Sequence, residues 1–147
     1  MSITSDYLQI RAKLDTAITA GLQGKVADGL KESVSRMAQK KVYDAYTPQP
    51  IFEESRRGKR GGIADPNNMI THVEGTTLTL DNVTGLQNLF GGGDSSLLVP
   101  IVEEGAAAYY QPGSREFMDD ARDEYVDNGD AKDDLMDAIR SAGFTVG

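Results

Sequence analysis

The chain has 147 residues, of which 39% are hydrophobic and 26% charged, and its formal net charge at neutral pH is −8. This length suits a single domain, and the composition is that of a globular protein and excludes wholesale disorder. The absence of cysteine excludes disulfides, zinc ribbons and iron–sulfur clusters, and a single histidine, His72, excludes an HExxH zinc helix. The surplus of acids argues against a general nucleic-acid binder, because neutralising phosphates requires lysine and arginine.

No apolar run approaches the roughly 18 residues that cross a bilayer. The opening stretch, MSITSDYLQIRAKLD, also lacks the basic and then long apolar pattern of a secretory signal. We therefore expect a protein made in a cytoplasm that does not act in a membrane.

Residues 1–46 are predicted to be helical. Two apolar series in steps of three and four residues indicate amphipathic helices, and Gly21 and Gly24 weaken the pattern between them. The series are Tyr7, Ile10, Leu14, Ile18 and Leu22, and then Val26, Leu30, Val34, Met37 and Val42. The pattern fits two helices or one long helix broken near the glycines, and neither apolar face is expected to need a partner outside the domain. Pro48 and Pro50 are expected to end the helical part.

Residues 51–66 are predicted to form an extended loop or arm. The stretch SRRGKRGG carries four cations among glycines, which favour a loop over a helix face. The cations are Arg56, Arg57, Lys59 and Arg60. Such a loop is able to contact phosphates or an acidic protein surface, and the plainer interpretation is a solvated surface.

Residues 69–105 are predicted to be rich in β-structure. Segments 69–74 and 76–82 alternate and indicate an antiparallel hairpin, with a tight turn at Glu74 and Gly75. His72 then lies in a strand, where a half-buried sheet residue is a better interpretation than a catalyst. Segment 84–96 is expected to be flexible, and 97–105 to be a strand or a short buried helix.

Residues 114–143 are predicted to form an acidic helical segment. Ten acids against three bases give residues 116–147 a net charge of −7. The apolar spacing fits one terminal helix or a pair, interrupted at Asn128 and Gly129, with Asp130 as the cap of the second piece. With the preceding elements this predicts a single α+β domain over residues 1–147: N-terminal helices, a small antiparallel sheet with long loops, and a C-terminal helix.

No motif assigns an enzymatic role to the chain. The GGGD string at residues 91–94 lacks the lysine and hydroxyl residue of a phosphate-binding P-loop, and the acidic segment lacks the glycine of a calcium-binding EF-hand. We therefore expect no catalytic site, no cofactor and no metal.

The order of these features resembles the head-to-tail connector proteins of tailed bacteriophages, variously called neck, tail-completion, tail-terminator or minor capsid proteins. Residues 40–69, KKVYDAYTPQPIFEESRRGKRGGIADPNNM, carry a Y-x-x-Y-x-P segment, an arginine-rich arm and a Gly-Gly-x-x-Asp-Pro turn. Residues 97–121 carry a Glu-x-Gly end and an Arg-x-Phe-Met element. Glu116 departs from the family pattern, in which a proline would be expected between Arg115 and Phe117.

The resemblance implies a structural virion protein at the head–tail junction, synthesised in the host bacterial cytoplasm. Its partners would be copies of itself in a ring, such as a hexamer or dodecamer, and adjacent neck, portal-side or tail-tube proteins, with DNA only as non-specific cargo in the channel. The expected contact residues are Tyr43, Tyr46, Arg56, Arg57, Lys59 and Arg60, and the expected channel-facing acids are Asp133, Asp134 and Asp137. The alternatives are an acidic inhibitor that imitates DNA, or another interaction protein.

Overall fold

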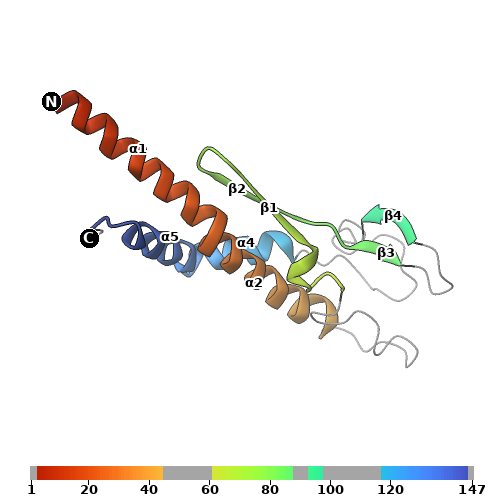
Figure 1. Cartoon of the computed structure of the whole chain (residues 1–147). Helices are drawn as coiled ribbons and strands as arrows, with labels where there is room; N and C mark the ends of the chain where they lie inside the picture. Colours follow the sequence, from red (N-terminus) through yellow and green to blue (C-terminus); the bar gives the residue numbers. More distant parts are fainter. Residues whose placement is uncertain (1–2, 45–60, 88–92, 98–116, 146–147) are drawn as a thin grey trace.

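The computed structural model describes residues 3–44, 61–87, 93–97 and 117–145. Within them the chain forms a long N-terminal helical rod, a β-hairpin, a second short pair of strands and two C-terminal helices (Figure 1). The expected α+β class, with N-terminal helices, a small antiparallel sheet and a helical C-terminal part, is therefore confirmed.

Residues 3–43 make one continuous helical rod. A π-helical turn, η1 (Leu22–Val26), joins α1 (Ile3–Gly21) to α2 (Ala27–Ala38), and a second π-helical turn, η2 (Gln39–Tyr43), ends the rod. Gly21 and Val26 keep right-handed helical backbone angles. The glycines therefore do not break the helix, and the irregularity near them is a change of hydrogen-bond spacing, as single π turns produce inside α-helices. Pro48 and Pro50 lie outside the described residues.

Close packing explains two glycines of the rod and leaves a third unconstrained. A Cβ added to Gly29 would collide with the hydroxyl of Tyr125, and one added to Gly21 would lie 2.8 Å from the Cβ of Ala138. A Cβ on Gly24 would meet nothing within 4 Å. Here glycine leaves room for neighbouring helices, in addition to its usual effect on helix propensity.

This difference predicts opposite effects of the same substitution. Gly24→Ala should raise the free energy of unfolding by up to about 1 kcal/mol, because glycine costs that much relative to alanine inside a helix. Gly29→Ala should lower it, since the collision with Tyr125 outweighs this gain. Urea unfolding of the two variants is the measurement, and a stabilised Gly29→Ala variant would contradict the packing described.

The expected hairpin is formed by β1 (Met69–Glu74) and β2 (Thr77–Asn82), which pair antiparallel. Because Glu74 pairs with Thr77, the tight turn consists of Gly75 and Thr76, one residue later than predicted. Gly75 has φ +61°, the left-handed backbone that two-residue hairpin turns require. His72 lies in β1 as expected, but its side chain is exposed rather than half-buried.

Two short strands occupy part of the segment that was expected to be flexible. β3 (Gly85–Gln87) and β4 (Gly93–Leu97) pair antiparallel with an irregular register. Part of segment 84–96 is therefore strand, within the region 69–105 that was predicted to be rich in β-structure. Of the strand or short helix predicted at 97–105, only Leu97 lies within the described residues.

The acidic segment forms a pair of helices, α4 (Met118–Asp127) and α5 (Asp130–Ser141). The interruption falls at Asn128 and Gly129, as predicted. Gly129 occupies the cap position with φ +86°, so Asp130 is the first residue of α5 and its predicted capping role is wrong. A left-handed corner favours glycine at this point, and Asp130 still stabilises the first turn through its charge.

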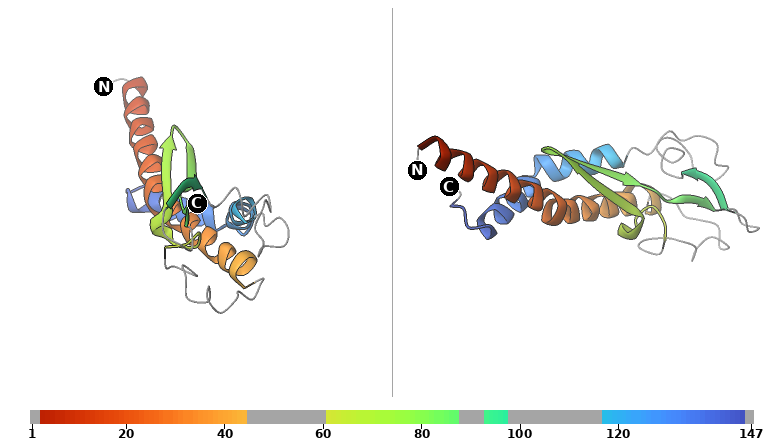
Figure 2. Two further views of the ribbon diagram at one scale, coloured as in Figure 1. Left: turned by 90° about the vertical axis from the view of Figure 1, so that its right-hand side faces the viewer. Right: turned by 45° about the horizontal axis from the view of Figure 1, so that its top comes forward.

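The hairpin and the C-terminal helices lie along the rod (Figure 2). Two apolar clusters hold them there. The larger contains the fully buried side chains of Val34, Val42 and Phe117. The smaller joins Leu22, Val26 and Tyr125, with partly buried hairpin residues packed against it. The rod is therefore the element that both other parts of the fold share.

The end of the predicted arm belongs to this core. Ile63 and Ala64 are buried and pack in the larger cluster with Tyr43 and Phe117. Burial of these two apolar side chains outweighs the glycine-rich composition that indicated an exposed loop through residue 66. Residues 51–60, which carry the four cations, lie outside the described residues.

The first half of α1 projects beyond the rest of the fold (Figure 1). Ile3, Tyr7 and Ile10 are 89%, 59% and 59% exposed, whereas Ala17 and Gly21 are buried. The described residues therefore leave the apolar face of this half of the helix uncovered.

Candidate functional site

A tight turn at residues 61–65 directly follows the basic segment in the sequence. The amide of Gly61 donates to Asp65 Oδ2 over 2.7 Å, and the amide of Asn67 donates to Asp65 Oδ1 over 3.0 Å. Gly61 has φ +80°, which glycine adopts without strain. These bonds, with that from Asn67 foremost, hold the pKa of Asp65 below its usual value. The ionised carboxylate therefore fixes both sides of the turn at neutral pH.

Hydrogen bonds fasten this turn to the rod and to the hairpin. Tyr43 Oη accepts from the amide of Ile63 over 3.2 Å, and Ser35 Oγ donates to the carbonyl of Ala64 over 2.6 Å. From the end of β2, Asn82 Nδ2 donates to the carbonyl of Ile63 over 2.7 Å. The last turn of the rod and the 61–65 turn are thus joined directly, so segment 45–60 leaves and re-enters the described structure at one corner.

The structure places one member of the predicted contact set. Tyr43 is 8% exposed and packs in the larger core cluster, so its ring serves the core of its own subunit and is not a surface contact. The other predicted contact residues lie outside the described residues. They are Tyr46, Arg56, Arg57, Lys59 and Arg60.

The three acids predicted to face a DNA channel lie on α5 and have different surroundings. Asp137 Oδ2 accepts from Lys25 Nζ over 2.7 Å, and Asp134 Oδ1 lies 3.9 Å from the same nitrogen. Asp134 Oδ2 also accepts from Tyr125 Oη over 2.7 Å. Asp133 is exposed and forms no ion pair within the part of the chain described. Asp134 and Asp137 are therefore paired with Lys25, and Asp137 also with Arg140, whereas Asp133 is the one of the three that has no ion pair in the described part of the chain.

These contacts shift the proton affinities of the groups involved. The hydrogen bond with Lys25 lowers the pKa of Asp137, and the same bond raises the pKa of Lys25. Burial, and then the bond to Asp134, raises the pKa of Tyr125 well above its usual range. Tyr125 therefore keeps its proton at physiological pH and remains a donor to Asp134.

The acids of α4 are also paired with cations. Glu124 Oε1 lies 3.5 Å from Arg36 Nη2, and Asp120 pairs with Lys41, so two rod cations face α4. On α4 itself, Arg122 forms ion pairs with both Asp119 and Asp123. Most of the acidic side chains of α4 thus form ion pairs with cations of the same subunit.

An acidic corner remains at the junction of α4 and α5. It consists of Asp127, Asp130 and Asp133, whose side chains are exposed and make no ion pair among the described residues. The corner is a separate feature from the acids that bind the rod. In the described residues, no group of three or more His, Cys, Asp or Glu side chains is arranged to hold a metal ion.

Two polar residues that hold the turn at residues 61–65 in place, called the locked turn from here on, were not predicted from the sequence. The Gly-Gly-x-x-Asp-Pro motif at residues 61–66 did indicate a turn, and its glycine and aspartate are the residues that close it. Ser35 and Asn82 carry no such signal, because each bonds a backbone carbonyl far away in the sequence. No helix in the described part of the chain is long and apolar enough to cross a membrane.

Comparison with curated proteins and with solved structures gives no significant match. A family model described as YomN matches residues 6–141, which run from the first turns of α1 to the end of α5. This match covers nearly the whole chain. The protein therefore belongs to YomN, a phage-derived family.

Proposed function

We propose that this protein is a structural virion protein of a tailed bacteriophage, forming a ring in the neck that joins the DNA-filled head to the tail. Membership of a phage-derived family supports the bacteriophage origin. In this proposal the protein is not an enzyme, and its work is done by surfaces that contact copies of itself and neighbouring rings.

The observation that carries the proposal is the locked turn at residues 61–65. It is tied to the rod through Tyr43 and to the hairpin through Asn82, so the residue that directly follows the basic segment, Gly61, begins a fixed turn. A segment held at both flanks loses less conformational freedom on docking than a free tail does. In the proposal, the four cations at positions 56, 57, 59 and 60 contact an acidic surface of the adjacent subunit or ring.

The acidic corner supports the same proposal from the other side of the contact. A cyclic ring needs two different complementary patches on each subunit, because its contacts are heterologous. Asp127, Asp130 and Asp133 form the exposed, uncompensated acidic surface of α4 and α5. Opposite charges on two patches give such a contact its orientation and select the correct neighbour.

A channel-facing role for acids is kept in the proposal chiefly for Asp133. Negative charge on the channel wall would keep DNA from adhering during ejection. Asp134 and Asp137 contribute less to such a field, because Lys25 pairs with both of them and Arg140 pairs with Asp137.

The ion pairs also weigh against the alternative of an acidic inhibitor that imitates DNA. Such an inhibitor needs outward carboxylates spaced like phosphates, whereas Asp120 and Glu124 pair with rod cations and Asp134 and Asp137 with Lys25. The direct test of the proposal is the position of the protein in the virion. Antibody-gold labelling of intact particles in the electron microscope should mark the head–tail junction.

A further inference from the structure

The exposed half of α1 continues an apolar stripe that is buried further along the helix. The stripe advances in alternating steps of four and three residues, the repeat by which two helices pack along a shared seam. Its members are Ile3, Tyr7, Ile10, Leu14, Ala17 and Gly21. The last two are buried, Leu14 is half-buried and the first three are exposed. One packed face therefore extends for about three turns past the part that the fold covers.

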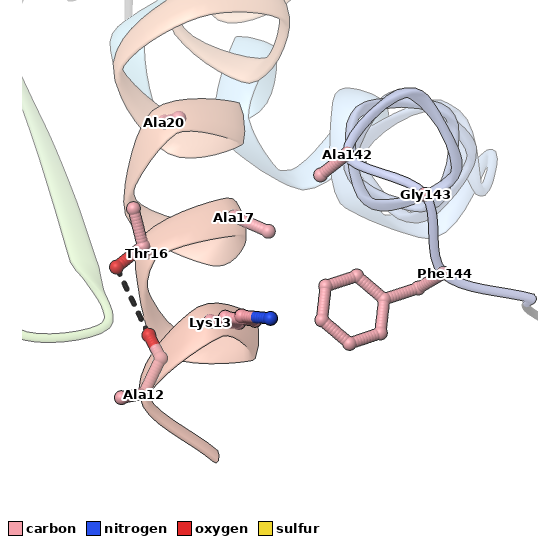
Figure 3. A pocket seen from close by; sticks show the side chains of 8 residues that line it. All are labelled: Ala12, Lys13, Thr16, Ala17, Ala20, Ala142, Gly143 and Phe144. Carbon is pink, nitrogen blue, oxygen red and sulfur yellow. Dashed lines mark hydrogen bonds between the residues drawn. The ribbon is translucent and has the colours of Figure 1, made fainter. Parts of the chain in front are cut away.

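The covered part ends where α5 ends. Asp134 lies beside Gly29 and Ala138 beside Gly21, so α5 runs antiparallel to the rod, toward the free half of α1. Beyond it, Ala142 and Phe144 form one wall of an open groove whose other wall is α1 between Ala12 and Ala20 (Figure 3). The groove has a volume of about 670 Å³ and is mostly apolar.

We propose that the exposed stripe binds the same stripe of a second copy of this chain, with the two α1 helices antiparallel. A two-fold axis between residues 8 and 9 places Ile3 of one copy opposite Leu14 of the other. It also places Tyr7 opposite Ile10. The four positions map onto one another under this axis, so no apolar member of the exposed stripe is left without a counterpart. Such a contact is isologous, with the same patch used by both copies.

The charges that flank the stripe fit this orientation. Asp6 and Lys13 directly precede the stripe residues Tyr7 and Leu14, so both lie on the same side of the seam. In an antiparallel pair, these flanking positions of one helix face those of the other. Asp6 of each copy therefore faces Lys13 of its partner, giving two ion pairs across the seam. Neither residue forms an ion pair among the described residues of its own subunit.

The end of α5 selects the antiparallel arrangement over the parallel one. In a parallel pair, the partner rod would continue past Leu14 to Ala17 and Gly21, where α5 already packs. In the antiparallel pair, the partner helix begins near Leu14 and runs away from the fold in the direction of α5. Its first turn then reaches the groove beside Phe144, and its positive end meets the negative end of α5.

The pairing does not depend on the neck proposal. It is two-fold, whereas ring closure uses a heterologous contact between different patches. The failure of either proposal therefore leaves the other standing.

Sedimentation equilibrium of the full chain over a range of concentrations tests the pairing. Asp6→Lys alone and Lys13→Asp alone put like charges opposite each other, and each should weaken self-association about tenfold. An equimolar mixture of these two variants should restore it, since every facing pair is again opposite in charge. Ile10→Asp should abolish pairing, and Gln9→Asp, which adds the same charge on another side of α1, should leave it unchanged.

Three results would overturn the proposal. The first is a wild-type chain that does not self-associate, and the second is self-association that Ile10→Asp leaves unchanged. The third is that self-association of the Asp6→Lys variant is restored by mixing it with an Arg11→Asp variant and not with Lys13→Asp. That result would indicate parallel helices. Circular dichroism of each variant checks that it folds. If Ile10→Asp does not fold, the mixture of the Asp6→Lys and Lys13→Asp variants still decides the test.

Discussion

Replacing Arg57 and Arg60 together by glutamate is expected to abolish head-to-tail joining and to lower the yield of infectious particles by orders of magnitude. The double change reverses the net charge of residues 51–60 from +2 to −2. Like charges brought together in a contact cost several kcal/mol, and many copies of the contact in a ring multiply the loss. Plaque titre and the fraction of tailless heads in electron micrographs are the measurements.

A matched variant separates charge from other effects of substitution at these two positions. Arg57→Lys with Arg60→Lys keeps the charge of the segment and should support joining far better than the reversed variant, with some loss because lysine cannot replace the planar fork of arginine. The thermal midpoint of each purified variant shows whether the subunit still folds. Normal titres from a folded, charge-reversed variant would rule out the proposed contact.

Asp65→Ala is expected to lower the free energy of unfolding by about 2–3 kcal/mol. The carboxylate accepts from the amides of Gly61 and Asn67, and charge-assisted bonds of this kind contribute roughly 1.5–3 kcal/mol. Asp65→Asn keeps an acceptor for one of the two amides and should lose less. Urea unfolding of the two variants beside the wild type gives the comparison.

The contribution of Asp65 should also depend on pH in a defined direction. Its pKa is lowered in the folded protein, so the folded state binds this proton less readily than the unfolded chain. The stabilisation is therefore complete above the ordinary pKa of 3.8 and is lost as pH falls through the lowered value. The gap between wild type and Asp65→Ala should stay constant from pH 7 to about 5 and narrow below about 4. A gap that is undiminished at pH 3 would show that Asp65 acts other than as a carboxylate.

Local patterns were sufficient to predict most of the elements. The three- and four-residue steps predicted the helices, and the alternation in segments 69–74 and 76–82 predicted β1 and β2. The hairpin turn was misplaced by one residue, because alternation locates strands whereas the left-handed backbone of Gly75 decides where they reverse. The same local pattern predicts Asp130 as a cap, whereas Gly129 holds that position through its backbone conformation.

Features that depend on packing between distant segments were not predictable in this way. Gly21 was interpreted as weakening the helix, and the structure shows that it lets α5 approach. Asp134 and Asp137 belong to a long acidic run, and only the packing of α5 on the rod brings Lys25 to them. Composition therefore indicated how much acid the segment holds but not which acids remain to act outward.

The position of the protein in the virion tests the central claim most directly. Intact particles, isolated heads and isolated tails would be labelled with antibody and gold and viewed by electron microscopy. A neck ring predicts label confined to the head–tail junction of intact particles, and its retention on isolated heads or on isolated tails identifies the structure that the ring completes. Label spread over the capsid or along the tail tube, or purified virions that contain none of the protein by immunoblot, would contradict the neck assignment.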